Sequence, residues 1–434
     1  MKFINITFGI IQFTLILYIL IKEIEKKSPS LFMWGTLFIM FAYPHLQTTI
    51  LYNYNYPDYI YLEASIFVIC FCILYILFRN KHKCSFIEIE KKYEIEADKI
   101  NNSAFEAICF AIFVISFLII LFGIIRSVGS IWNASWGSVR SIEHDYFSLN
   151  SFATRIIITF SGFSLYYFLT NRKKLALFVL ALFLLYVLIK KSRADILPIL
   201  IFIILLVLMK IKHLKPRHFI LGAVSIFGII YIVYSLRAFR WLGTTSNAIS
   251  NFSWDYINNA VFQSLRNKEG ELGLYSYFYY FIYHDNSFTG FNSGATYIRI
   301  LLTFFPRQLT FGLKPESFDL TMGRAIGMAS GGSMHPTLFG DSFGNFWWFG
   351  VLLGVLWAFF ANFTDRLISC QKYHFFKIMI YFMTAFSFVL IGRGSVYNGF
   401  QYSAWGILII FILKYIYYRT PKIRFRLKKK NDIN

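Results

Sequence analysis

The feature that most constrains this chain is the recurrence of apolar runs, each about 15–20 residues long, along most of its length. Of its 434 residues, 57% are hydrophobic and only 15% are charged, whereas a soluble protein is roughly 45–50% apolar and about 25% charged. Such a run crosses hydrocarbon as a helix, because a helix satisfies its own backbone hydrogen bonds. We therefore expect an all-α integral membrane protein.

The apolar pattern predicts about eleven transmembrane helices. We place them at residues 3–21, 31–44, 59–78, 104–124, 152–169, 175–189, 196–209, 219–236, 346–363, 375–391 and 403–418. Two further apolar segments, 272–284 and 295–305, are short, and we expect surface-lying or re-entrant helices there. If such segments also cross, the count rises to about 13–14. No small-residue cleavage site follows the first apolar run, so we expect it to be a span rather than a removed signal.

Basic residues set the expected orientation and the division of the chain. The tail 419–434 is rich in Lys and Arg and should be cytoplasmic, which places 22–30, 79–103, 170–174, 210–218 and 364–374 inside as well. The formal net charge of +21 then records membrane anchoring, and we expect no nucleic-acid partner. The expected parts are an N-terminal bundle at 1–236, a large outer loop at 237–345, C-terminal helices at 346–418 and the basic tail at 419–434.

One long polar interruption, 237–345, is the expected functional centre. It ends in a Gly-rich and Ser-rich stretch, 330–345, which we expect to be a loop lining a polar site, since exposed backbone of this kind is excluded from hydrocarbon. His335 is a candidate for proton transfer or phosphate binding. Asp341 and Glu271 are candidates for binding a sugar hydroxyl or acting as a base. Tyr280 lies in an aromatic run that could stack on sugar rings.

The expected outer face carries more cations than the positive-inside rule favours. The set is Arg126, Arg140, Lys190, Lys191, Arg193, Arg237, Arg240, Arg266, Lys268, Arg299, Arg307, Lys314, Arg324 and Arg393. Most are arginines, whose planar guanidinium group binds phosphate through two parallel hydrogen bonds. Arg237 and Arg240 are one helical turn apart and should share a helix face. The set predicts an anionic, phosphate-bearing ligand near the bilayer surface.

Simpler explanations remain open for each residue taken alone. An outer arginine can contact lipid phosphates or a local carboxylate, as Asp195 beside Arg193 could provide. Asp341 and Glu271 can equally be counter-ions, and the aromatic run can form an interfacial belt. The sequence contains no phosphate-binding loop, dinucleotide fingerprint, metal-binding motif or nucleophile elbow.

The layout and motifs resemble those of the Wzy-type O-antigen polymerases and of the related O-antigen ligases. The shared features are about a dozen spans, a short outer turn with Lys191-Ser192-Arg193, and one long outer loop before the last three spans. The most specific stretch runs from His335 to Asp341 and into the spaced glycines Gly350 and Gly354. Pro336 stands where the ligase pattern has Asn, Ser or Gln, which weakens the transfer of the ligase role.

This resemblance implies a multi-span glycosyltransferase of the GT-C-like class in the bacterial inner membrane, with its active face periplasmic. It would transfer a growing polysaccharide from undecaprenyl pyrophosphate to the non-reducing end of a lipid-linked repeat unit, with neither a metal nor another cofactor. The resemblance implies catalytic roles for His335, Arg193, Arg240 and Arg237. We expect the other substrate contacts to come from a second set, namely Arg393, Arg324, Arg307, Lys191, Glu271, Asp341 and Tyr280.

Two alternatives follow from the same sequence. One is an O-antigen ligase, and the other, from a different class, is a flippase for lipid-linked oligosaccharides. A flippase should carry charges through a central membrane cavity, whereas the intramembrane charges expected here are few, at most Arg155 and Glu106. The membrane lipid is an expected partner, and the sequence leaves open whether a chain-length regulator and a flippase bind as well.

Overall fold

The computed structural model describes residues 1–80, 103–143, 149–210, 216–266, 270–287, 292–305, 307–327 and 334–419. The expected linker at 79–103, the stretch 330–333 and the basic tail therefore lie almost wholly outside the described residues. For Arg193, Glu271 and Arg307 the structure describes the backbone but not the side chain.

Within the described residues all regular structure is helical, in agreement with the expected fold class. The α-helices are α1 (Lys2–Lys26), α2 (Leu31–Leu37), α3 (Tyr43–Leu51), α4 (Asp58–Phe78), α6 (Ser103–Val128), α7 (Trp136–Glu143), α8 (Leu149–Thr159), α9 (Phe163–Leu169), α10 (Lys173–Lys190), α11 (Leu197–Lys210), α12 (Pro216–Trp241), α13 (Thr245–Ser250), α14 (Trp254–Arg266), α15 (Ser276–Tyr283), α16 (Ala295–Leu301), α17 (Phe318–Ala325), α18 (Thr337–Phe346), α19 (Leu353–Ser369), α20 (His374–Gly392) and α21 (Val396–Arg419). Short 3₁₀ or π segments are η1 (Phe38–Ala42), η4 (Ile131–Asn133), η5 (Phe160–Gly162), η6 (Arg193–Ile196), η7 (Gly270–Gly273), η8 (Arg307–Thr310) and η9 (Trp347–Leu352).

Among the described residues, seven helical stretches are long and apolar enough to cross a membrane. They are Lys2–Lys26, Asp58–Phe78, Phe105–Val128, Leu149–Leu169, Thr337–Ser369, His374–Gly392 and Val396–Arg419, and each coincides with an expected span. The other four expected spans correspond to helices at α2–α3, α10, α11 and α12. The structure thus supports an all-α membrane protein with several spans, and the full count of eleven stays a prediction.

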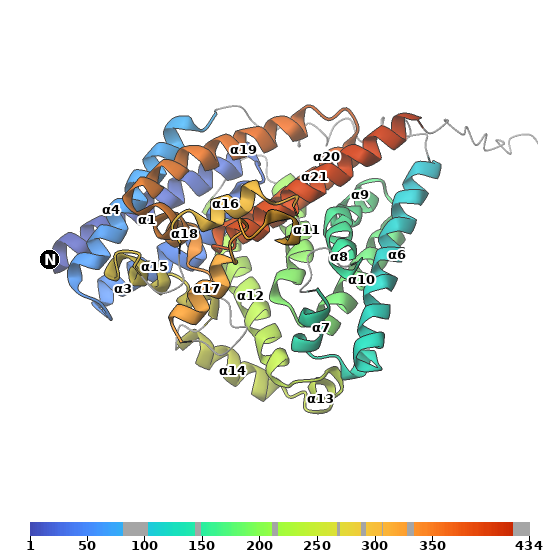
Figure 1. Ribbon diagram of the computed structural model, residues 1–434, viewed down its shortest axis with the longest axis horizontal. Coiled ribbons are helices and arrows are strands. Elements are labelled where there is room, and N and C mark those ends of the chain that lie inside the picture. The colour runs from blue at the N-terminus through green and yellow to red at the C-terminus, as the bar shows by residue number, and fades with distance from the viewer. Residues whose placement is uncertain are drawn as a thin grey trace, which may run out of the picture.

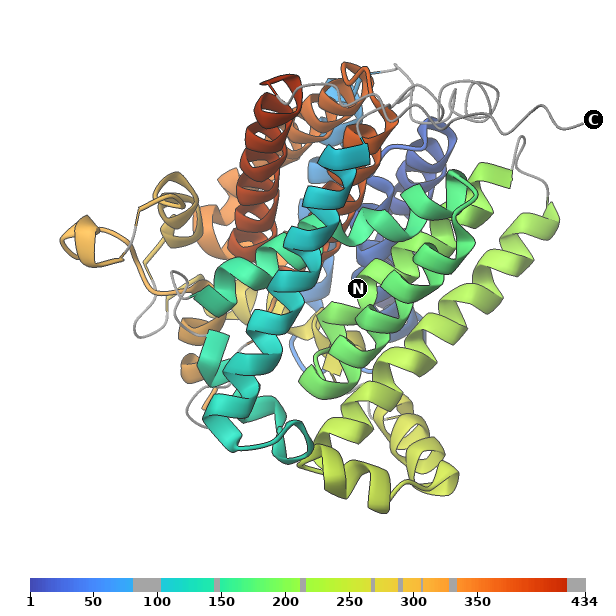
Figure 2. The ribbon, with the colours of Figure 1, turned by 90° about the vertical axis from the view of Figure 1, so that its right-hand side faces the viewer.

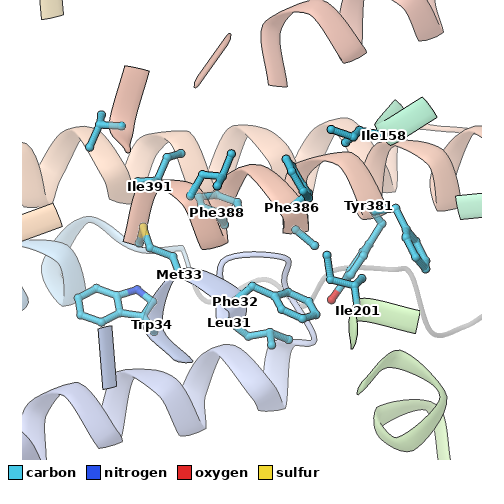
Figure 3. Packing of buried hydrophobic residues seen from close by; sticks show 14 of the residues in the cluster. Leu31, Phe32, Met33, Trp34, Ile158, Ile201, Tyr381, Phe386, Phe388 and Ile391 are labelled. Atoms are coloured by element: carbon cyan, nitrogen blue, oxygen red, sulfur yellow. The ribbon is translucent and has the colours of Figure 1, made fainter. Parts of the chain in front are cut away.

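Helix α20 forms the centre of the bundle. Of its membrane-spanning stretch, 94% of the residues are buried inside the protein, which fits a helix that is apolar on all sides. Leu31 to Trp34 of α2 face it from one side, and Ile158 and Ile201 approach near Tyr381 (Figure 3). Helix α21 runs beside it, while α1 and α4 lie toward one end of the molecule and α6 at the other (Figure 1).

The expectation of a loop at the end of the polar interruption is wrong, because residues 337–346 form helix α18. Every residue from Thr337 to Asn345 is buried, so the Gly-rich and Ser-rich backbone packs inside the protein rather than against lipid. A Cβ on Gly344 would lie 3.0 Å from the Phe318 ring and 3.2 Å from the Phe281 ring. The glycines therefore serve close helix packing, a role that small residues often have in membrane bundles.

The short apolar segments of the outer loop are short helices, as expected. Helix α15 is not surface-lying, since Phe278 and Phe281 are fully buried and the helix packs between α4 and α18. Helix α16 contacts α21 and α18. Helix α14 packs against the last turns of α12, and α13 and α14 both lie at the lower edge of the view in Figure 1. The gold segment near residue 300 stands out from one side of the bundle (Figure 2).

Candidate functional site

A small polar cavity lies where α16, α17, the start of α18 and the start of α21 meet. We call it the acidic cavity, and its lining residues are Thr296, Ser317, Phe318, Asp319, His335, Asp341, Gly394, Ser395, Val396, Tyr397 and Asn398. Its volume is about 10 Å³, which is room for one water molecule or one hydroxyl group. Two of the residues expected at the functional centre, His335 and Asp341, therefore share one cavity.

A glycine turn fixes the two walls of the acidic cavity to each other. The Thr337 backbone N–H, at the start of α18, donates to the Arg393 carbonyl at 3.2 Å. Gly394 has a φ of +92°, and a Cβ there would lie 2.5 Å from the Thr337 nitrogen. A residue with a side chain would be strained and would clash at this position, so the close approach of the turn to α18 requires glycine.

His335 faces an acid that the sequence did not single out. Its Nε2 lies 3.9 Å from Asp319 Oδ2, and its side chain is buried. The Met334 N–H donates to the Asp319 carbonyl at 3.0 Å, which holds the His335 segment against α17. Ser317 donates a hydrogen bond to the Asp319 carboxylate and orients it. A half-buried carboxylate facing a buried histidine is an arrangement that can hold and move a proton.

Asp341 is the most deeply buried acid of the cavity, with an exposed fraction of 1%. Its Oδ2 accepts from Thr296 Oγ1 at 3.2 Å. Asn345, one turn further along α18, donates to the Asp341 carbonyl at 2.8 Å and to Thr296 Oγ1 at 3.1 Å. Oδ1 of Asp341 has no hydrogen-bond partner among the described atoms. The carboxyl group is thus held by one oxygen, and the other is available to a hydroxyl group.

Two cations, Arg299 and Lys314, lie over the ring of Tyr397 on the wall of the acidic cavity, and Arg155 is close enough to Lys314 to interact with it electrostatically. We call Arg155, Arg299 and Lys314 the cation cluster, and all three are buried. The Arg299 guanidinium lies 4.4 Å and the Lys314 Nζ 5.7 Å from the centre of the Tyr397 ring. Arg155, on α8, packs at 5.2 Å from the ring of Trp405 on α21. Arg155 is distant in sequence from Arg299 and Lys314, so the fold itself brings these charges together.

The electrostatics of the cluster appear in the pKa of Lys314. Burial, together with the positive charges of Arg299 and Arg155, lowers this pKa from the usual 10.5 to about 8. Arg299 donates to the Pro315 carbonyl at 2.7 Å, and Lys314 donates to the Phe305 carbonyl at 2.8 Å. Backbone carbonyls thus orient the two side chains while the like charges repel. A bound anion would relieve this repulsion.

A second group of cations lies at the ends of α10 and α12. Lys190 Nζ lies 3.2 Å from Asp195 Oδ2 and donates to the Tyr186 hydroxyl at 2.9 Å. Lys191 is buried, donates to the Gly243 carbonyl at 2.5 Å, and has a pKa lowered to about 8 by burial. The turn at 190–195 therefore contacts the segment that follows α12.

The two arginines near the end of α12 each stack on a tryptophan. Arg237 lies 4.8 Å from the centre of the Trp241 ring, and Arg240 lies 3.6 Å from the centre of the Trp136 ring. Both side chains are half-buried. They share the end of one helix, as expected, but their guanidinium groups contact different rings.

Helix α8 connects the two groups of cations. The hydroxyl groups of Thr154 and Tyr186 lie 3.4 Å apart, and Tyr186 also accepts from Lys190. The next residue along α8 is Arg155 of the cation cluster. Polar contacts thus run from the turn at 190–195 to Thr154 of α8, the residue before Arg155.

Several expected site residues lie apart from the acidic cavity. Arg324 is exposed and forms an ion pair with Glu316, which fits the counter-ion explanation. Tyr280 is half-buried, with its ring centre 4.3 Å from that of His284. Arg393 contributes its carbonyl group to the Thr337 contact. The side chains of Arg193, Glu271 and Arg307 are outside the described atoms.

Sequence reasoning missed Asp319, Thr296, Asn345 and Tyr397 as site residues. The spacing of Asn345, four residues after Asp341, would have placed both on one face of a helix. This spacing carried no weight because the stretch was expected to be a loop. Among the described residues no group of three or more His, Cys, Asp or Glu is placed to hold a metal ion. No family model, no curated protein and no solved structure matches the chain.

Proposed function

We propose that this chain is an O-antigen polymerase, a membrane-embedded glycosyltransferase acting on undecaprenyl-pyrophosphate-linked oligosaccharides at the periplasmic face. The observation that carries the proposal is the pairing of two unlike sites across Tyr397. On one side the buried cation cluster is suited to a diphosphate, and on the other the acidic cavity has room for one hydroxyl group. A transferase of this kind needs both functions within a short distance of each other.

The cation cluster provides charge stabilisation for the leaving group. In the proposed reaction the acceptor hydroxyl oxygen forms a bond to the anomeric carbon, while the bond from that carbon to the lipid diphosphate breaks. Negative charge then grows on the departing diphosphate. Fixed guanidinium and ammonium groups in a buried site stabilise such charge, and removal of one such donor typically lowers kcat by roughly 10²–10³-fold.

The acidic cavity orients the acceptor and takes its proton. In this proposal His335, facing Asp319, is the base that removes the hydroxyl proton, and Asp341 accepts a hydrogen bond from the acceptor through Oδ1. General bases of this kind contribute typically 10²–10⁴-fold to rate. Because the cavity admits about one hydroxyl group, the remainder of the acceptor sugar would lie outside it.

The test is incubation of the purified protein with lipid-linked repeat units, without added metal or nucleotide sugar. The proposal predicts a ladder of polymer that remains attached to undecaprenyl pyrophosphate. A ligase would instead move sugar to lipid A when this acceptor is supplied, and a flippase would make no new glycosidic bond. Either of these results would overturn the proposal, provided that a thermal unfolding transition shows the protein to be folded.

A further inference from the structure

A second cavity lies far from the acidic cavity along the central helix α20. The acidic cavity adjoins Gly394, just beyond the end of α20, whereas near the start of α20 the Tyr381 hydroxyl donates to the Lys27 carbonyl at 3.1 Å. There the last turns of α1 and α4 enclose about 370 Å³, lined by Tyr18, Ile19, Lys22, Glu23, Glu25, Lys26, Tyr75, Ile76 and Arg79. A volume of this size is in the range of ligand-binding cavities, which is roughly 300–1,000 Å³.

The lining of this cavity changes from apolar to charged along α1. Tyr18 and Ile19 belong to the apolar part of the helix, and the charged residues begin one turn later, at Lys22. On α4, Ile76 comes before the charged Arg79 in the same order. The apolar end of the cavity therefore lies beside the apolar parts of α1 and α4, and its charged end lies at their last turns. This is the order of acyl chain and head group in a bilayer.

The charged back wall is already neutralised within the protein. Arg79 donates to both carboxylate oxygens of Glu23 at 2.8 Å, and it also binds Asp365 and Asn362. Glu23 accepts a further hydrogen bond from Ser30 at 2.7 Å. This network has its own partners, so a ligand would find its charged contacts at the front of the cavity.

The front of the cavity presents both signs of charge. Lys22 and Glu25 form a half-exposed pair at 2.9 Å. Lys26 lies 3.8 Å from Glu23, beyond hydrogen-bond distance, so its ammonium group has donors left. Three cations (Lys22, Lys26, Arg79) face three acids (Glu23, Glu25, Asp365), so the cavity and its back wall have no net charge.

We propose that this cavity binds one phospholipid with a zwitterionic ethanolamine head group. The lipid phosphate contacts Lys26 and Lys22, the primary ammonium donates to Glu25, and an acyl chain lies along Ile19 and Ile76. A neutral set of charges matches a head group that has both signs, whereas an anionic head group would add an uncompensated charge. The ammonium also supplies N–H donors for a carboxylate, which a choline head group lacks.

Binding of this lipid would hold α1 against α4, and so it can be measured as stabilisation of the folded state. The experiment uses the full chain purified in detergent, depleted of lipid, and then supplied with phosphatidylethanolamine, phosphatidylcholine or phosphatidylglycerol at equal mole fraction. We expect phosphatidylethanolamine to raise Tm the most. Equal shifts with all three lipids, or a larger shift with phosphatidylglycerol, would overturn the proposal.

Two variants with matched controls locate the effect. Ile76→Trp fills the apolar part of the cavity, while Leu77→Trp places the same ring on an adjacent, 70% exposed position of α4. Lys26→Gln removes the phosphate contact, while Lys2→Gln changes the opposite end of α1.

We expect Ile76→Trp and Lys26→Gln to lose the specific Tm shift, and the two control variants to keep it. For Lys26→Gln the apparent affinity should fall about tenfold, as for the loss of one charged hydrogen bond. A shift that persists in both cavity variants would place the lipid elsewhere.

Discussion

The buried ionic network at the ends of α1, α4 and α19 permits a quantitative prediction. Arg79, on the last turn of α4, binds Glu23 of α1 through two parallel hydrogen bonds and also binds Asp365 of α19. Glu23 is 1% exposed and Asp365 is 7% exposed. The substitution Arg79→Met preserves much of the side-chain volume but leaves two carboxylates buried without their common cation. Removal of one partner from such a network costs roughly 3–5 kcal/mol of unfolding free energy.

The assay is reversible unfolding in mixed micelles, followed by circular dichroism or by accessibility of a reporter cysteine. The control is Arg324→Met, which breaks the exposed Arg324–Glu316 pair and should leave stability unchanged. The triple variant Arg79→Met, Glu23→Gln, Asp365→Asn should recover much of the loss, because the uncompensated charges are gone. If Arg79→Met cost no more than the control, the network would not be the internal ion cluster described above.

Three further outcomes test other parts of the account. Gly354→Ala should destabilise by roughly 1–3 kcal/mol in the same unfolding assay, because its Cβ would lie 2.5 Å from a backbone carbonyl of α4, whereas Gly228→Ala, which meets open space, should not. Lys314 has a native pKa of about 8, below the usual 10.5, so the ligand-free protein should gain stability as pH rises from about 8 to 10.5. Over that range Lys314 loses its charge, so diphosphate binding measured by calorimetry should weaken, and Lys314→Arg should abolish that pH dependence. Asp341→Asn should lower the polymerisation rate about tenfold or more while leaving the thermal transition within a few degrees, and an unchanged rate would exclude Asp341 from the acceptor site.

The sequence predicted the seven described stretches that are long and apolar enough to span a membrane, because the signal is local. An apolar run such as Asp58–Phe78 needs no tertiary information to be identified as a span. The Gly-rich stretch at 337–346 misled the same reasoning, since glycine spacing is compatible with a loop and with a helix packed closely on its neighbours. The choice between them depends on what lies opposite, here the rings of Phe281 and Phe318. That information is not local.

The candidate site was predicted in part for the same reason. Arg299 and Lys314 belong to the outer cations that the sequence singled out, and Arg155 was recognised as an unusual intramembrane charge. Their proximity depends on the packing of α8 and α16 on α21, which no sequence spacing encodes. Arg324 differs, because its partner Glu316 is close in sequence as well as in space. The sequence alone therefore allowed the explanation that Arg324 pairs with a local carboxylate.

The central claim is that the cation cluster around Tyr397 holds the lipid diphosphate during glycosyl transfer. The most direct measurement is the single-turnover rate of polymerisation by Arg299→Gln and by Arg324→Gln, each compared with the unaltered protein. The account predicts a fall of roughly 10²-fold or more for Arg299→Gln and a rate within about twofold for Arg324→Gln, whose guanidinium is exposed and paired with Glu316. Equal rates for both variants, with both proteins folded, would contradict it.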